Sequence, residues 1–186
     1  MGLQIEGGTG NGYSAGVNAI GQLTVAATTI TKEHEVNHNE GQAYSLPVSV
    51  TPTAAGDCFL YLRNNSDSEL IVSEIALTAA TTETISIKLG DGGIPIGGNT
   101  TTPVNRNAGS GNQADVTAQS GVDITGLSGG SVVFGWTVEG GVSTQRVVPA
   151  SGFILPKNKV LTAYVATGGI AISLGLGISF HMAHGK

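Results

Sequence analysis

The chain has 186 residues and a formal net charge of −5, from 8 Lys plus Arg and 13 Asp plus Glu. The few basic residues are not clustered, so the sequence lacks the electrostatic footprint of a nucleic-acid-binding protein. With 29 glycines and only 11% charged residues, the composition disfavours long helices and favours short strands joined by turns.

The N-terminus differs from the rest of the chain. Residues 1–16 contain six glycines and few large apolar groups, and such a segment buries too little surface to order itself. We predict a flexible arm over residues 1–16 and a single domain over residues 17–186, since no linker divides the remainder. The start of the chain lacks the basic and apolar runs of a signal peptide, so we expect the protein to be made in the cytoplasm and used without Sec export.

The first strands are predicted before residue 51. Residues 17–25 suggest a pair of strands, and in residues 43–50 apolar side chains alternate with small or polar ones. Pro47 has no N–H to donate, so this second strand is expected at a sheet edge or a bulge.

Residues 34–38, His-Glu-Val-Asn-His, match the H-E-x-x-H pattern of zinc proteases, in which a helix places two imidazoles one turn apart. A helix here would have about two turns and no apolar face. In an extended chain, His34 and His38 would lie about 13 Å apart, too far to share one metal ion. Tyr44 stands where the longer metzincin pattern has a third His. We therefore interpret the segment as a polar strand or turn, and expect no metal, no cofactor and no enzymatic activity.

Residues 58–77 form the most strongly patterned stretch, with two apolar runs flanking the turn-forming residues 64–68. We predict a β-hairpin whose first arm is central in its sheet, with Phe59 and Tyr61 sharing one face. Cys58 is the only cysteine and is predicted to be a buried core residue rather than a nucleophile.

Residues 83–89 alternate as a strand covered on one face, whereas residues 90–130 are rich in Gly, Asn, Thr and Ser. A loop of that length within a compact domain is usually functional or held by a partner. Short strands are expected within it at Val116 and at residues 122–124.

The remaining strands are predicted at residues 131–138, 144–148, 152–155, 159–166 and 170–182. The last has a strict period of two, and it is too short and too strand-like to span a membrane as a helix. Its small face, residues 171–179, favours either subunit packing, most simply in a trimer, or close packing within the monomer. Eight to ten short strands without helices indicate a β-sandwich or barrel.

Four stretches are considered together: residues 33–44, Phe-Leu-Tyr-Leu-Arg-Asn at 59–64, residues 17–25 after the glycine-rich arm, and residues 103–111. They resemble small β-rich structural proteins of tailed-phage virions, namely capsid decoration (cement) and head-fibre-like proteins. This resemblance implies an antiparallel, jelly-roll-like β-sandwich, commonly trimeric, that binds the major capsid protein on the virion surface. It carries over no catalytic residue.

Three functional classes follow. The first is a structural protein that clamps neighbouring capsid subunits, with no nucleic acid or membrane as partner. The second is a fibre or receptor- and carbohydrate-binding module, although Trp136 is the only tryptophan and aromatic groups for stacking sugars are scarce. The third is the zinc hydrolase argued against above.

Overall fold

The computed structural model describes residues 4–6, 12–14, 16–17, 23–24, 31–141, 144–149, 152–166 and 174–183. The chain divides into two compact units, Met1–Thr31 and Lys32–Lys186. In the first unit β1 (Gln4–Glu6) pairs with β2 (Gly12–Ser14), and β3 (Gly16–Val17) pairs with β4 (Leu23–Thr24), which confirms the strand pair predicted for residues 17–25. The predicted flexibility of residues 1–16 concerns a segment that lies largely outside the described residues.

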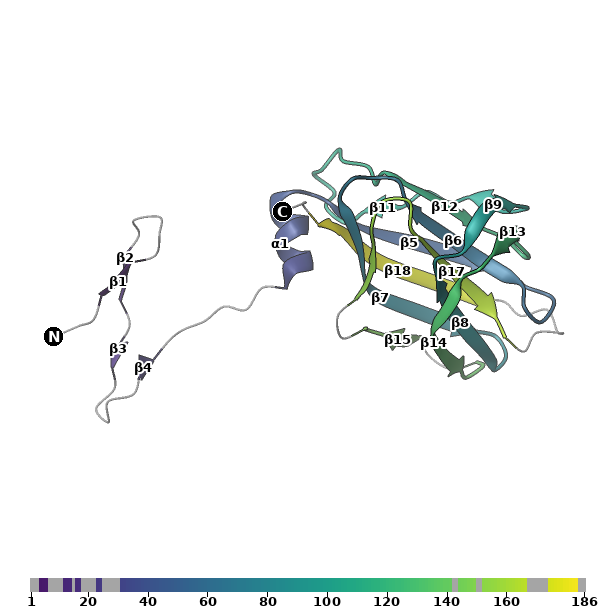
Figure 1. Cartoon of the computed structure of the whole chain (residues 1–186). Coiled ribbons are helices and arrows are strands. Elements are labelled where there is room, and N and C mark those ends of the chain that lie inside the picture. Colours follow the sequence, from purple (N-terminus) through teal and green to yellow (C-terminus); the bar gives the residue numbers. More distant parts are fainter. Residues whose placement is uncertain are drawn as a thin grey trace. The chain divides into compact units, whose positions relative to one another are not determined.

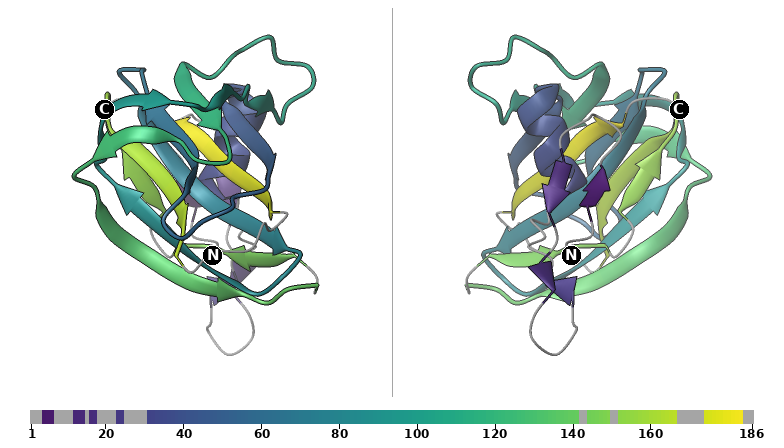
Figure 2. Two further views of the ribbon diagram at one scale, coloured as in Figure 1. Left: turned by 90° about the vertical axis from the view of Figure 1, so that its right-hand side faces the viewer. Right: turned by 90° about the vertical axis from the view of Figure 1, so that its left-hand side faces the viewer.

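The second unit is a sandwich of two six-stranded sheets whose named strands all pair antiparallel (Figure 1). The β6 sheet has the order β10 (Asn99–Thr100), β12 (Val116–Ser120), β6 (Cys58–Asn64), β17 (Val160–Val165), β8 (Glu83–Leu89), β14 (Ser131–Val138). The β18 sheet has the order β11 (Val104–Asn105), β5 (Ala43–Val50), β18 (Leu174–Ala183), β7 (Glu69–Ala79), β15 (Gln145–Val147), and β16 (Phe153–Leu155) also pairs with β7. Figure 2 shows the sandwich turned by 90° to either side.

The strand pairs are nested. β5 pairs with β18, β6 with β17, β7 with β15 and β16, and β8 with β14. From β5 to β8 the chain changes sheet at every step, and β15 to β18 return in the reverse order. This arrangement is that of a jelly roll, so the predicted fold class is confirmed.

The hairpin predicted for residues 58–77 is wrong. Both strands are present, but β6 and β7 belong to opposite sheets, and the turn between them crosses the sandwich. The buried Asn64 side chain holds this crossing, since its Nδ2 donates to the carbonyl oxygens of Ser68 at 2.7 Å and Leu155 at 2.8 Å. A turn signal shows where the chain reverses, but it does not show which strand each arm pairs with.

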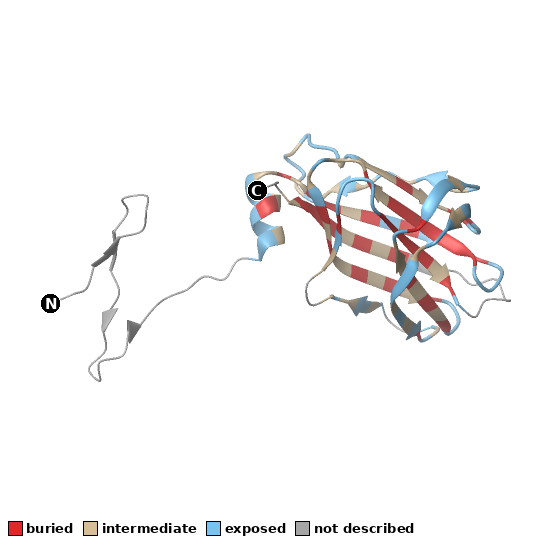
Figure 3. Ribbon diagram, viewed as in Figure 1, coloured by how far each residue is buried: buried red, intermediate tan, exposed pale blue. Residues whose placement is uncertain are grey.

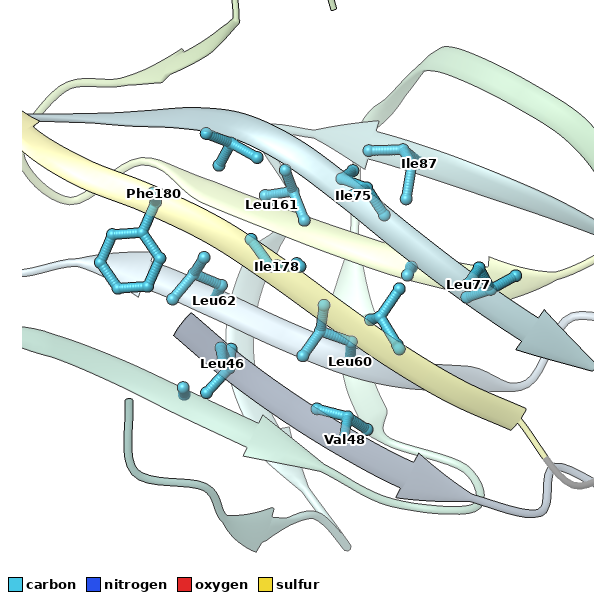
Figure 4. Packing of buried hydrophobic residues seen from close by; sticks show 14 of the residues in the cluster. Leu46, Val48, Leu60, Leu62, Ile75, Leu77, Ile87, Leu161, Ile178 and Phe180 are labelled. Carbon is cyan, nitrogen blue, oxygen red and sulfur yellow. The ribbon is translucent and has the colours of Figure 1, made fainter. Parts of the chain in front are cut away.

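The core fills the space between the sheets (Figure 4). Leu60 and Leu62 of β6 and Ile178 and Phe180 of β18 are fully buried there, and burying each such side chain contributes about 1.5–3 kcal/mol. Figure 3 shows the alternation of buried and partly buried positions along the strands. The central position predicted for the first arm of residues 58–77 is confirmed, because β6 lies between β12 and β17.

The expected faces of β6 are altered by a bulge. Opposite β6 the register shifts between Ala163 and Tyr164, which leaves Phe59 as an extra residue. Phe59 therefore joins Leu60 in the main core, whereas Tyr61 packs on the outer side of the sheet. The predicted shared face of Phe59 and Tyr61 is wrong, because strict alternation ends at a bulge.

Residues 34–38 are helical, which corrects the expected strand or turn. Helix α1 covers Lys32–Asn39 and buries Val36 against the sandwich. Its C-terminal end is capped by residues far along the chain: Nδ2 of Asn107 donates to the carbonyl oxygen of Asn37 at 2.9 Å, and Nδ2 of Asn112 to that of Glu40 at 2.8 Å. A short polar helix needs such partners for its last carbonyls.

Pro47 lies at a position where its missing N–H leaves no strand pairing unsatisfied. The edge strand β11 pairs only with Tyr44 and Ser45 of β5, so the exposed Pro47 lies beyond the region that β11 covers. The edge position expected for this strand is therefore confirmed at Pro47, whereas the start of β5 is covered by β11. Within the described residues no helix is long and apolar enough to cross a membrane.

Candidate interaction surface

The segment 90–130, expected as a long loop, contains five short strands. β10 and β12 extend the β6 sheet, and β11 extends the β18 sheet. The two ends of the segment, β9 (Gly92–Ile96) and β13 (Thr125–Ser128), pair with each other as a separate ribbon. The strand expected at Val116 is confirmed by β12, whereas residues 122–124 do not form one. The same segment therefore supplies an edge strand to each sheet, and its β9–β13 ribbon forms an extra layer.

Glycines set the shape of this β9–β13 ribbon. Gly93 and Gly126 have φ of +99° and +77°, a region that side chains other than glycine rarely adopt. A Cβ on Gly93 would collide with the carbonyl oxygen of Gly126. The register shifts between Thr125 and Leu127, so the ribbon contains a bulge beside Gly126.

The underside of the ribbon is packed. Leu127 of β13 and the neighbouring Ile124 contact a second apolar cluster on the outer face of the β6 sheet, formed with Cys58, Tyr61, Val160 and Tyr164. Cys58 is 1% exposed, which confirms its predicted burial. Burial raises the pKa of its thiol to about 12, so it carries almost no thiolate at neutral pH.

Asp91 anchors the base of the ribbon. Its carboxylate is buried and accepts hydrogen bonds from the Gly130 N–H at 2.8 Å, the Tyr164 hydroxyl at 2.9 Å and the Thr162 hydroxyl. The Lys88 ammonium lies 3.8 Å from the centre of the Tyr164 ring. Asp91 directly precedes the β9 end of the ribbon, and Gly130 follows its β13 end. Through its hydrogen bonds to Gly130, Thr162 and Tyr164, the Asp91 carboxylate therefore links both ends of the ribbon to β17.

The other side of the ribbon presents apolar groups to solvent. Ile94 is 78% exposed and Ile96 is 61% exposed, although both lie on a strand held by the contacts just described. Pro95 lies between them, so they occupy alternate positions of β9. A fixed apolar surface that the described fold leaves uncovered is typical of a protein–protein contact site. We define Ile94 and Ile96 with the β9–β13 ribbon as the candidate interaction surface.

The two histidines of the H-E-x-x-H pattern lie closer together than we expected, because they lie on one helix. In α1 the rings of His34 and His38 are stacked, with centroids 6.3 Å apart, so the argument from an extended chain is wrong. Both side chains are exposed. Among the described residues, however, no group of three or more His, Cys, Asp or Glu side chains is placed to hold a metal ion.

The small-residue face predicted for residues 171–179 falls on β18, which is the central strand of its sheet. Residues 171–173 lie outside the described part of the chain. Gly177 and Ser179 are partly buried, and they are flanked by Pro47 and Ser45 of β5. On the other face Leu176, Ile178, Phe180 and Met182 are buried, which confirms the predicted period of two for that part of the strand.

A polar pocket of about 200 Å³ opens at one end of the sandwich. Its lining residues are Gln42, Tyr44, Ser66, Ser68, Asn112, Gln113, Asp115 and Met182. Burial raises the pKa of Tyr44, which stacks on Phe180 in the core. The pocket therefore has apolar residues below and amides, hydroxyls and one carboxylate around it.

Sequence reasoning missed the ribbon and its two isoleucines. Ile94 and Ile96 were expected only as isolated apolar residues in a loop. The available signal was their alternation about Pro95 and the paired glycines that flank them. No protein-family model matches the chain, and no curated protein matches it.

Proposed function

We propose that this chain is a non-enzymatic structural protein of a phage virion, which decorates and stabilises the capsid by binding the lattice of the major capsid protein. The observation that carries the proposal is the exposed pair Ile94 and Ile96 on an anchored ribbon. A rigid apolar surface binds with little entropic cost, because its side chains and backbone are ordered before the partner arrives.

Two further features support a binding role. The jelly roll is a fold used by viral capsid proteins and lectins, although fold alone does not establish function. Burial is the largest cause of the altered pKa values of Tyr44, Cys58, Tyr164 and His181, and the first three pack with the apolar clusters of the sandwich. Such groups stabilise a scaffold more readily than they perform catalysis.

The proposal also assigns roles in capsid binding to the N-terminal arm and to oligomerisation. The N-terminal arm, residues 1–16, in which β1 and β2 pair with each other, can add a strand to an exposed edge of a capsid subunit, where main-chain hydrogen bonds supply the recognition. In a homotrimer, three arms and three ribbons would act together, and effective concentration would convert weak single contacts into firm binding.

The test uses undecorated capsids of the phage whose genome encodes the chain. Purified wild-type protein is mixed with these particles, and occupancy is measured by co-sedimentation. The double variant Ile94→Ser with Ile96→Ser should lose at least about tenfold in affinity, equivalent to about 1.4 kcal/mol. The control Val148→Ser alters an equally apolar side chain that is 67% exposed away from the ribbon, and it should bind as the wild type does.

Two results would contradict the proposal. Wild-type protein that fails to bind any capsid form would refute decoration itself. Equal binding by wild-type and doubly substituted protein would remove the ribbon from the contact, and deletion of residues 1–16 would then show whether the arm alone attaches the protein.

A second candidate function, binding of a carbohydrate receptor, is favoured by the polar pocket. Sugar hydroxyls both donate and accept hydrogen bonds, which matches the amides, hydroxyls and carboxylate around this pocket. Its volume of about 200 Å³ suits a single sugar ring rather than a longer chain. A screen against neutral mono- and oligosaccharides, repeated with Asn112→Ala and with Asp123→Asn as a control on another loop, tests it. Absence of binding by the wild type would refute this second candidate.

A further inference from the structure

The free edge of β14 is the longest strand edge among the strands at the ends of the two sheets. β10 and β11 have two residues each, and β15 and β16 have three. β14 has eight residues, Ser131–Val138, and among the strands that the structure describes it pairs on one side only, with β8. Along an edge strand every second residue leaves its N–H and C=O without a ladder partner.

Other long stretches of unpaired strand edge contain a residue that hinders pairing with a further strand, whereas most of β14 does not. The uncovered part of β5 contains Pro47, and β9 contains Pro95, each of which removes a donor. β14 contains neither proline nor a charged residue. It has one bulge, at Val133, near its beginning, and from Phe134 to Val138 its pairing with β8 is regular.

The side chains of β14 are also apolar at the surface. Val132 is 59% exposed and Val133 is 45% exposed. Phe134 and Trp136 pack together with ring centroids 5.2 Å apart, yet both remain partly exposed at the border of the core. The indole Nε1 of Trp136 is buried and has no hydrogen-bond partner among the described residues. Aromatic side chains at a partly open, apolar edge are typical of the centre of a protein interface.

We infer that β14 pairs antiparallel with β14 of a second copy of this chain, about a twofold axis, so that two β6 sheets join into one continuous sheet.

The identity of the partner follows from the properties of the β14 edge. Unpaired main-chain groups require an extended strand as partner. Within the described sandwich, only another β14 offers a sheet-end strand of the same length. An antiparallel pairing about a twofold axis places the residues at the centre of the strand opposite or near their own symmetry mates, so a charge there would meet a like charge. β14 is uncharged over all eight residues, and self-pairing therefore carries no such cost.

This contact is independent of the capsid proposal. It joins copies two at a time, so it is also distinct from the threefold assembly proposed above. A protein that uses both contacts forms species with an even number of chains, whereas a protein that uses only a threefold contact does not form a dimer.

The test combines sedimentation velocity with fluorescence of Trp136, the only tryptophan in the chain. Wild-type protein should form a dimer whose tryptophan emission shifts to longer wavelength on dilution, as the edge becomes exposed. Gly135→Lys places a positive charge in the middle of the strand, and a Cβ at Gly135 meets only ordinary contacts, the nearest being the Ile85 carbonyl oxygen at 3.5 Å. This variant should raise the dimer dissociation constant by about tenfold or more.

Val133→Lys is a second edge variant with the same expected effect, and Val148→Lys is the matched control at an exposed valine outside β14. Circular dichroism and the thermal midpoint establish that all three variants fold. A monomer at every wild-type concentration would overturn the inference. A dimer that both edge variants leave unchanged would also overturn it, because the contact would then lie elsewhere.

Discussion

The outer faces of the two sheets differ sharply, although their inner faces share one core. The outer face of the β6 sheet carries Cys58, Tyr61 and Tyr164, and it is covered by the β9–β13 ribbon. The outer face of the β18 sheet carries small residues such as Gly177 and Ser179, and the described cover there is α1 at one end. Large apolar groups on an outer face require a further layer, whereas small and polar groups can remain in contact with water.

The largest effect is expected where the extra layer is packed. Tyr61 is 2% exposed beneath the ribbon, and Tyr61→Ala should lower the free energy of unfolding by about 3–5 kcal/mol, as for other buried aromatic residues. Chemical denaturation measures the change. A loss below about 1 kcal/mol would mean that the ribbon adds little to the fold.

Removing the anchor of the ribbon should have an intermediate effect. Asp91→Ala leaves the buried Thr162 hydroxyl without its acceptor, at a cost of about 1–3 kcal/mol, whereas the partly exposed Tyr164 hydroxyl can turn to water. Hydrogen exchange should rise in residues 92–96 and 125–128 more than in β18. Uniform exchange across both sheets would show instead that the ribbon does not open separately.

A pH-dependent effect is expected at the covered end of the other sheet. His181 is 4% exposed, and within the part of the chain that the structure describes neither of its ring nitrogens has a hydrogen-bond partner. Burial lowers its pKa, opposed by Glu33 and Glu40 and supported by Lys32. The unfolded chain therefore binds the proton more readily, and stability should fall as the pH drops below about 6.5, the ordinary pKa of histidine.

His181→Gln isolates this contribution. Thermal midpoints measured from neutral pH downward should fall less steeply in the variant than in the wild type. Parallel curves for the two proteins would show that His181 does not contribute to the pH dependence.

The smallest effect on stability is expected on the outer face of the β18 sheet. Ser179 is partly buried between β5 and β7, and Ser179→Ala should change stability by less than about 0.5 kcal/mol. Denaturation under the conditions used for Tyr61→Ala gives a direct comparison. A loss approaching that of Tyr61→Ala would mean that this face is as tightly covered as the other.

Much of the strand content was predictable from the sequence, because alternation is written into the residues themselves. The positions of β5, β8, β14 and the described part of β18 follow from a period of two, and the edge position of Pro47 follows from its missing N–H. The burial of Cys58 follows from its apolar neighbours. Of the candidate surface, only its location within residues 90–130 was predictable, since the isoleucines of β9 lie among glycines and polar residues.

By itself, the sequence determined most of the longer strands and that those strands make a β-sandwich, because side-chain size and periodicity act locally. Tertiary structure decided which strands are neighbours. β6 and β7 separate into different sheets because each finds its partners, β17 and β18, about a hundred residues further along the chain. It also decided that residues 34–38 form a helix, because Asn107 and Asn112 cap it from a distant loop. Long-range hydrogen bonds and packing choose among local conformations that are nearly equal in free energy.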